Sequence, residues 1–268
     1  MWIWNDFFEY YWIQKNKVFY LFAHYENLWY MPIPPLGEGP LNELVSVGFE
    51  TMNRLNPNRS LSRIENLSLI EISKIDLSRF NCTLKAWDYL YRRIKVCALK
   101  GNEYKGKRVA YNHFVKNYHP EYLPFSSNDI NRCIRLYDLW MEKKREKIRF
   151  NGDLYELYLM EDCRIAHHRM MTEFDVLGLI GRVVWIDSEI RGYIFGTELN
   201  ETTLVVIAEV TDVTYKGISQ FIFREFCNEQ ERYPWINVMD DSGLSSLRKV
   251  KDSYRPDLLI PAYILNDS

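Results

Sequence analysis

The sequence predicts an α+β fold of two tandem units, each with a mixed, mostly antiparallel sheet and flanking helices. Three observations lead to this prediction. Apolar runs of strand length alternate with segments of helical periodicity along the 268 residues. The second half has the expected order helix, three strands, helix, strand, helix, strand. The first half repeats much of that order, although it does not repeat the residues themselves.

The spacing of aromatic residues predicts the first element, a helix at the N-terminus. Trp4, Phe8, Tyr11 and Trp12 recur at helical spacing, so residues 1–15 are expected to form an amphipathic helix. The runs that follow predict a hairpin over 18–23 and 28–33, a helix over 41–55, and strands over 67–72 and 87–91.

The two units are expected to meet near a central helix. Ser126 to Asp129 carries capping side chains for a helix over 130–147. We therefore expect an N-terminal unit over 1–125, a connecting helix within 126–150, and a C-terminal unit over 151–268. The elements expected in the C-terminal unit are helices over 154–171, 217–227 and 244–254 and strands over 177–186, 192–199, 203–209, 235–238 and 258–265.

Composition excludes several classes of protein. Hydrophobic residues make up 47% and charged residues 26%, which is typical of a globular domain. The net charge of −2 means that nucleic acid or an anionic membrane must be bound through a local patch. No run approaches the 18 apolar residues of a membrane span, and the N-terminus lacks the basic start of a secretion signal. These features predict a cytoplasmic location.

Metal binding is not expected. The five cysteines are scattered, odd in number and without a Cys-x-x-Cys pair, which is typical of a reducing compartment without a zinc site. His167 and His168 are adjacent, so on a helix their side chains point about 100° apart and cannot readily share a metal ion.

The most informative stretch runs from Trp235 to Pro256, WINVMDDSGLSSLRKVKDSYRP. A short strand breaks at residues 240–243, where an Asp or Ser is expected to cap the following helix. Leu247, Val250 and Tyr254 have the spacing of a buried stripe, and a basic stripe borders it at Arg248, Lys251 and Arg255. Half-sheltered cations hold phosphate or carboxylate well. Spacing alone equally describes a solvated charged face.

This stretch resembles the closing motif of the phosphatidylglycerol lysyltransferase C-terminal domain family. The matching positions are Asn237, Asp241, Gly243, Leu247, Arg248, Lys251, Ser253, Tyr254 and Pro256. A block in the first half resembles the family's other motif at Asp88, Tyr89, Tyr91, Leu99, Gly101, Lys107 and Arg108. The resemblance implies two tandem acetyltransferase-like (GNAT) units. It also implies transfer of an amino acid from a charged tRNA, which the best-known members place on a lipid.

The loop before the helix at 217–227 bears on the donor. Acyl-CoA users of this fold carry Gln or Arg, two residues, Gly, one residue, and Gly or Ala there, and the backbone amides cradle a pyrophosphate. This sequence has Thr214 at the first position, Gly217 at the glycine and Ser219 last, while Lys216 supplies positive charge. We expect an anion-binding loop that is not adapted to coenzyme A. The alternative is a glycine required only by the tight start of the helix.

A second basic segment lies between Lys95 and Lys116, with six Lys or Arg residues and one acidic residue. Tyr104, Tyr111 and Phe114 are interleaved with them, a mixture that suits phosphate contacts and base stacking. We expect this segment to grip tRNA phosphates through Lys105, Lys107 and Arg108. The alternative is a solvated helix whose aromatic residues lie in the core.

The resemblance also assigns expected roles. Arg248 and Lys251 would hold the ester carbonyl oxygen or the terminal phosphate. Asp241 or Glu209 would accept a proton or bind the ammonium group of the amino acid, Glu209 resembling the family's acidic residue before the loop. The residues expected to bind substrate or phosphate are Lys216, Gly217, Asn237, Tyr254, Lys105, Lys107 and Arg108. Asp241 as a helix cap, Asn237 as a turn residue and Tyr254 as a core residue are equally open.

Three functions follow from these expectations. The first is an aminoacyltransferase that uses charged tRNA and an amine or hydroxyl acceptor, either a small molecule or a peptide. The second is an N-acyltransferase that uses acyl-CoA, because the fold hosts this chemistry widely. The third is a non-catalytic module that binds an anion or a lipid headgroup. No permanently bound cofactor is expected, and the sequence fixes neither the acceptor nor the oligomeric state.

Overall fold

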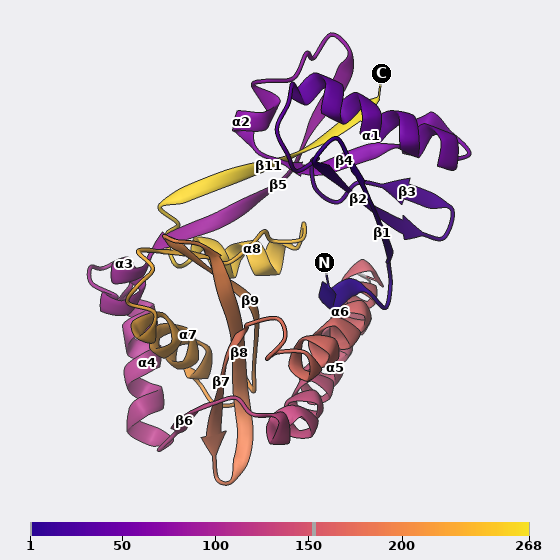
Figure 1. Cartoon of the computed structure of the whole chain (residues 1–268). Helices are drawn as coiled ribbons and strands as arrows, with labels where there is room; N and C mark the ends of the chain where they lie inside the picture. Colours follow the sequence, from indigo (N-terminus) through magenta and orange to yellow (C-terminus); the bar gives the residue numbers. More distant parts are fainter. Residues whose placement is uncertain (1, 152–153, 268) are drawn as a thin grey trace. The chain divides into compact units, whose positions relative to one another are not determined.

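The computed structural model describes residues 2–151 and 154–267. The chain forms two compact units (Figure 1): Met1–Asp88 with Ile260–Ser268, and Tyr89–Leu259. We refer to them as unit 1 and unit 2. Two strands, β5 (Phe80–Arg92) and β11 (Leu258–Asp267), have residues in both. These units do not coincide with the expected halves 1–125 and 151–268, and an internal repeat at those bounds stays a prediction.

Unit 1 contains a small antiparallel sheet in the order β1 (Glu9–Lys15), β2 (Val18–Tyr25) and β3 (Leu28–Tyr30). Helix α1 (Leu41–Leu55) follows, then β4 (Arg63–Leu67), which pairs antiparallel with β11, and the short helix α2 (Leu69–Ile72). Two 3₁₀ turns, η1 (Trp2–Trp4) and η2 (Arg59–Leu61), complete the unit. The core forms where Val45, Phe49 and Met52 of α1 join buried residues of β2 and β4.

Unit 2 is built on a sheet with the strand order β5-β10-β9-β8-β7-β6. Its other strands are β6 (Glu121–Pro124), β7 (Ile180–Ile186), β8 (Glu189–Asn200), β9 (Thr203–Thr211) and β10 (Trp235–Asn237). The helices are α3 (Arg93–Ala98), α4 (Lys105–Asn117), α5 (Ile130–Asn151), α6 (Leu154–Thr172), α7 (Ile218–Glu229) and α8 (Ser245–Asp252), with η3 (Ser127–Asp129) before α5. Neighbouring strands are antiparallel except for β9 and β10, which run parallel.

Alternate residues of β8 show which helices cover each face of this sheet. A Cβ at Gly192 would contact Ile218 and Ile222, so α7 packs on that face. The next residue, Tyr193, bonds His167 of α6 on the opposite face. Figure 1 shows α4 and α7 on one side of β7 to β9 and α5 with α6 on the other. The unit therefore has three layers, with its main core between the sheet and α7.

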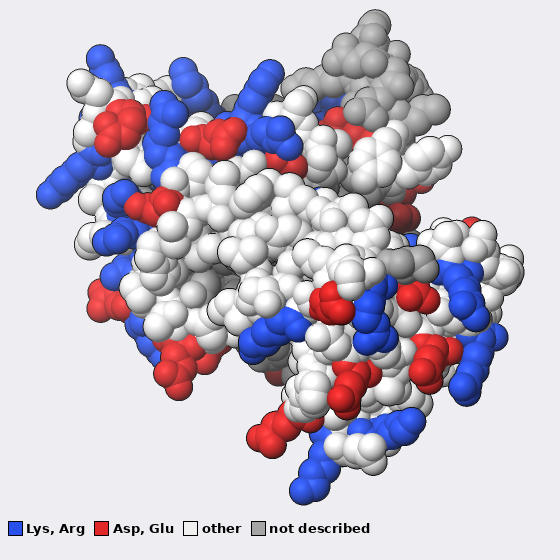
Figure 2. Space-filling view, turned by 90° about the horizontal axis from the view of Figure 1, so that it is seen from above, with Lys and Arg blue, Asp and Glu red and all other residues white. Residues whose placement is uncertain are grey.

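Most predicted elements are confirmed. The predicted helix over 41–55 matches α1 at both ends, and the strands predicted over 18–23 and 28–33 form the β2–β3 hairpin. The order helix, three antiparallel strands, helix, strand, helix, strand holds from α6 to β11. The predicted α+β class is therefore confirmed. On the face seen in Figure 2, Lys and Arg are intermixed with Asp and Glu, which agrees with the small net charge.

Two predicted elements of unit 1 are wrong. Residues 9–15 form strand β1, not part of a helix, because Asn16 and Lys17 adopt positive φ and turn the chain back onto β2. Aromatic residues also favour strands, so their helical spacing misled the prediction. The strand predicted over 67–72 ends at Leu67, because Ser68 and Glu71 form a capping box that begins α2.

Candidate functional site

The parallel strands β9 and β10 pair over only three residues, and the site lies on β9 beyond that pairing. The pairs end at Asn237 and Val205, whereas β9 continues to Thr211. On the other side of β9, Phe195 pairs with Ala208 and Gly196 with Val206, so Ile207 is an extra residue in a bulge. The bulge changes the direction of the side chains that follow it.

Glu209 lies two residues after this bulge, opposite Ile194. Its side chain is accessible to solvent. The protein that surrounds it nevertheless raises its pKa to about 8, an effect that Lys107 partly offsets. This carboxyl group is therefore both accessible to solvent and surrounded by other protein groups. Such a group titrates near neutral pH and is therefore suited to accept and return protons.

The charge of Lys107 of α4 acts on this carboxyl group. Burial lowers the pKa of Lys107 to about 8, and the charge of Glu209 acts in the opposite direction. The Lys107 Nζ lies 3.9 Å from the centre of the Tyr254 ring. Glu209, Lys107 and Tyr254 therefore form one cluster, although they come from β9, α4 and the residues after α8. The sequence assigned Lys107 to tRNA phosphates, so its electrostatic interaction with Glu209 was missed.

Asp241 and Arg248, both expected to be catalytic, bond to each other. Arg248 Nε donates to Asp241 Oδ2 over 2.7 Å, and the Tyr89 hydroxyl donates to the same oxygen over 2.8 Å. Burial alone would raise the pKa of Asp241, but these hydrogen bonds outweigh it and hold the pKa below its usual value. An acid so stabilised as a carboxylate is a weak proton acceptor. The Arg248 side chain stays 61% exposed, so an anionic group can reach it.

The turn before α8 is held by its own motif residues. Lys251 Nζ donates to the backbone oxygens of Val238, Met239 and Asp240. Asn237 Oδ1 accepts from the backbone N–H of Met239 over 2.6 Å, as the turn interpretation predicted. The expected capping of this helix by an Asp or Ser side chain is wrong, because Leu244 occupies the cap position without a side-chain hydrogen bond. Asp241 Oδ1 instead accepts from Gly243 within the turn.

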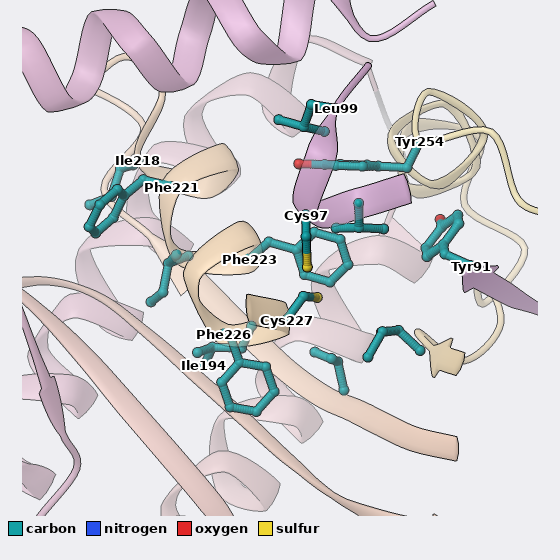
Figure 3. Packing of buried hydrophobic residues seen from close by; sticks show 14 of the residues in the cluster. Tyr91, Cys97, Leu99, Ile194, Ile218, Phe221, Phe223, Phe226, Cys227 and Tyr254 are labelled. Carbon is teal, nitrogen blue, oxygen red and sulfur yellow. The ribbon is translucent and has the colours of Figure 1, made fainter. Parts of the chain in front are cut away.

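Tyr254 is a core residue that also borders the cluster. Its ring packs against Phe223 of α7 with 5.0 Å between centroids, and its backbone oxygen accepts from the Tyr104 hydroxyl. Figure 3 shows the ring among buried residues that include Leu99 and Phe223. The predicted buried stripe is only partly correct, because Val250 is 55% exposed. Helix α8 ends at Asp252, so the spacing to Tyr254 does not follow a continuous helix.

The loop before α7 uses Gly217 for packing. Gly217 has φ of +98°, and an added Cβ would lie 2.0 Å from the Ala110 carbonyl oxygen of α4. The Ile218 N–H is already bonded to Tyr215, and Thr214 bonds Asp212 Oδ1 through its hydroxyl. This is the geometry that the alternative interpretation of Gly217 predicted. Lys216 is exposed beside it.

Of the other two basic residues expected to bind tRNA, one forms hydrogen bonds within the protein and the other is exposed to solvent. Arg108 Nη1 donates to the carbonyl oxygens of Leu99 and Gly101, so it holds the loop between α3 and α4. Lys105 is exposed at the start of α4. The structure therefore brings Lys107 to Glu209 and places Lys105 and Arg108 elsewhere on α4.

Within 2–151 and 154–267, no group of three or more His, Cys, Asp or Glu side chains is placed to hold a metal ion. In the same part of the chain, none of the helices has both the length and the apolar character that crossing a bilayer requires.

Comparisons with solved structures show the fold. A conserved protein of unknown function from Bacteroides thetaiotaomicron superposes with a TM-score of 0.86 at 23% identity, over 99% of this chain and 88% of that one. L-PGS from Bacillus licheniformis gives 0.67 at 12% identity, over 97% and 84%. A tandem GNAT protein from the clavulanic acid biosynthesis pathway gives 0.51 at 8% identity, over 93% and 78%. The predicted GNAT-like fold is therefore confirmed.

A comparison with curated proteins gave no match. The family model described as "Phosphatidylglycerol lysyltransferase, C-terminal" matches residues 1–266, nearly the whole chain. Apart from Asp88, the matched residues of the two motifs lie in unit 2, where β5, the turn after β10 and α8 bring Tyr89, Asp241 and Arg248 into contact. The chain belongs to the phosphatidylglycerol lysyltransferase C-terminal domain family.

Proposed function

We propose that this protein is an aminoacyltransferase that moves an aminoacyl group from the ester of a charged tRNA onto an amine or hydroxyl acceptor. The observation that carries the proposal is the electrostatic interaction of the accessible Glu209 carboxyl group, on β9 beyond its pairing with β10, with Lys107. Both groups have pKa values of about 8, so each can exchange a proton near neutral pH. Family membership supports the donor class.

The reaction needs one proton acceptor and one positive group. The acceptor nitrogen or oxygen attacks the ester carbonyl carbon, and the Glu209 carboxylate takes the proton that it loses. The Lys107 ammonium group stabilises the negative charge on the carbonyl oxygen in the tetrahedral intermediate. When the intermediate collapses, the C–O bond to the ribose breaks and Glu209 returns the proton to the leaving oxygen. The aminoacyl group and the proton are thereby both accounted for.

In this proposal the residues of the C-terminal motif mainly hold other residues of the site in position. Asp241, Arg248 and Tyr89 fix the turn after β10, and Lys251 fixes the same turn through its carbonyl groups. That turn leads through α8 to Tyr254, whose ring contacts Lys107. The exposed Arg248 side chain also supplies a place for the terminal phosphate of the donor, as the sequence led us to expect.

The test is a transfer assay with radiolabelled aminoacyl-tRNA and a panel of amine, peptide and lipid acceptors. Glu209→Gln should lower the rate by about a hundredfold or more, the range of general base catalysis. The matched control is Glu201→Gln, an exposed carboxylate between β8 and β9, which should leave the rate unchanged. Transfer that survives Glu209→Gln at the wild-type rate would show that Glu209 is not the base.

An acyl-CoA donor is the second candidate, because the tandem GNAT neighbour is described without its AcCoA and Lys216 is exposed beside the start of α7. Against it, α4 closes over Gly217. Coenzyme A at about 100 times its dissociation constant would stabilise the protein by about 2.7 kcal/mol. Thermal stabilisation by coenzyme A, and none by a non-hydrolysable aminoacyl-adenosine, would favour this candidate. Binding of either ligand without turnover would indicate a non-catalytic module.

A further inference from the structure

Unit 1 contains a polar cavity that the transfer chemistry does not use. Its volume is ≈ 590 Å³, a size typical of small-molecule sites. One wall is a single face of α1, where residues recur at helical spacing, and the others come from η2, the start of β5 and the end of β11. The lining residues are Ser46, Phe49, Glu50, Asn53, Arg54, Arg59, Arg79, Phe80 and Asp267.

Three arginines line this cavity: Arg54, Arg59 and Arg79. Within the described part of the chain, none of them forms an ion pair with a carboxylate. Arg79 lies 5.5 Å from the centre of the Phe80 ring and donates to Ser46 Oγ over 3.3 Å, so its guanidinium group is held in place. Guanidinium groups match phosphate oxygens in geometry and charge. Three in one cavity therefore favour a phosphoryl group.

The same cavity offers acceptors for hydroxyl groups. Asn53 Nδ2 donates to Asp267 Oδ2 over 2.7 Å, which fixes the orientation of the amide. Asn53 Oδ1 is then buried without a hydrogen-bond partner. This oxygen has almost no surface open to the cavity, so the acceptors left for a ligand are those of Asp267 and Glu50. Glu50 adds a further acceptor on the same wall.

We infer that this cavity binds a small phosphorylated sugar or polyol, with the phosphate on the arginines and the hydroxyl groups on Glu50 and Asp267. Arg54, Arg59 and Arg79 against Glu50 and Asp267 leave a formal charge of +1 in the cavity before binding. An anion is therefore favoured over a neutral sugar. The acceptors distinguish a phosphorylated sugar from bare phosphate, which has fewer donors to offer them.

The experiment is calorimetric titration of the full chain with ribose 5-phosphate, inorganic phosphate and ribose. Ribose 5-phosphate should bind about tenfold more tightly than inorganic phosphate, and ribose should not bind measurably. Arg59→Gln and Arg79→Gln should each weaken ribose 5-phosphate binding by about tenfold or more. Lys74→Gln removes an exposed charge of unit 1 outside the cavity and should have no effect.

Glu50→Gln separates this proposal from a general attraction of anions. The substitution removes a negative charge, so inorganic phosphate should bind more tightly, while the advantage of ribose 5-phosphate should shrink. Absence of saturable binding of ribose 5-phosphate to a folded wild-type protein would overturn the inference. Binding that survives both arginine substitutions would overturn it too, because the ligand would then lie elsewhere. Neither result depends on aminoacyl transfer.

Discussion

Gly217→Ala should destabilise unit 2 far more than a glycine substitution usually does. The new Cβ would lie 2.0 Å from the Ala110 carbonyl oxygen, so helix α4 must move by about 1 Å to reach the shortest distances that real contacts show. Overpacking of this kind costs about 1–3 kcal/mol. The positive φ of Gly217 adds about 1 kcal/mol, because residues with a Cβ avoid that conformation. The expected loss of stability is therefore about 2–4 kcal/mol.

Two glycines provide the control. Gly178 and Gly243 also have positive φ, but nothing lies within 4 Å of a Cβ added to either. Their alanine variants should lose only the backbone term of about 1 kcal/mol. Native-state hydrogen exchange of the β8 and β9 amides would measure the unfolding free energy of unit 2 separately from unit 1. Equal losses in all three variants would refute the close approach of α4 to Gly217.

Four further predictions follow from the site and its surroundings. Tyr89→Phe removes the hydroxyl that bonds the Asp241 carboxylate and should cost about 1.5 kcal/mol by the same exchange measurement; a negligible loss would mean that this bond does not hold the turn. Lys107→Met removes the charge that lowers the pKa of Glu209, so the rise of transfer rate with pH should move above pH 8; an unmoved profile would exclude the pairing. Burial lowers the pKa of His167 to about 4, below the value of 6.5 expected when unfolded, so the unfolded state binds the proton first and stability should fall as pH drops from 6.5 to 4. His167→Gln should flatten that dependence in urea titrations, and His168→Gln should not. Val250→Ser should change stability by less than about 0.5 kcal/mol, because that side chain is 55% exposed.

Sequence reasoning succeeded where an element is set by local chemistry. Helix α1 was predicted at both ends because the stretch from Pro32 to Gly37 precedes it and Asn56, Pro57 and Asn58 follow it. It failed at the N-terminus, where the spacing of Trp4, Phe8 and Trp12 satisfies a helix as well as a strand. Residues 9–15 form a strand because Asn16 and Lys17 adopt the left-handed conformation and turn the chain back, so that β1 pairs with β2. Neither residue is a glycine, so the turn has no strong signature in the sequence.

The site was predictable only in part, for a related reason. Glu209 was singled out by resemblance, but its proximity to Lys107 joins residues about a hundred positions apart, and no local spacing reports such a contact. The motif residues Asp241, Arg248 and Lys251 were singled out together, and the structure places all three at the turn after β10. Arg248 bonds Asp241 while Lys251 bonds backbone oxygens, and these contacts depend on the turn after β10 and on Tyr89 from a distant strand. The sequence thus indicated a group of neighbouring residues and not which of them bond to one another, and the catalytic roles assigned to them stay a prediction.

Unit 1 is built from two segments that lie far apart in the chain, and this affects the order in which the two units fold during synthesis. Strand β4 pairs with β11, so the edge of β4 at Leu67 stays unpaired until Tyr263 has been synthesised. All of unit 2 is made in between, as one uninterrupted segment that has its own core. During synthesis, residues 89–259 are therefore complete before β11 emerges, whereas unit 1 still lacks its last strand. Until β11 emerges, the open edge of β4 is available to chaperones and to other chains.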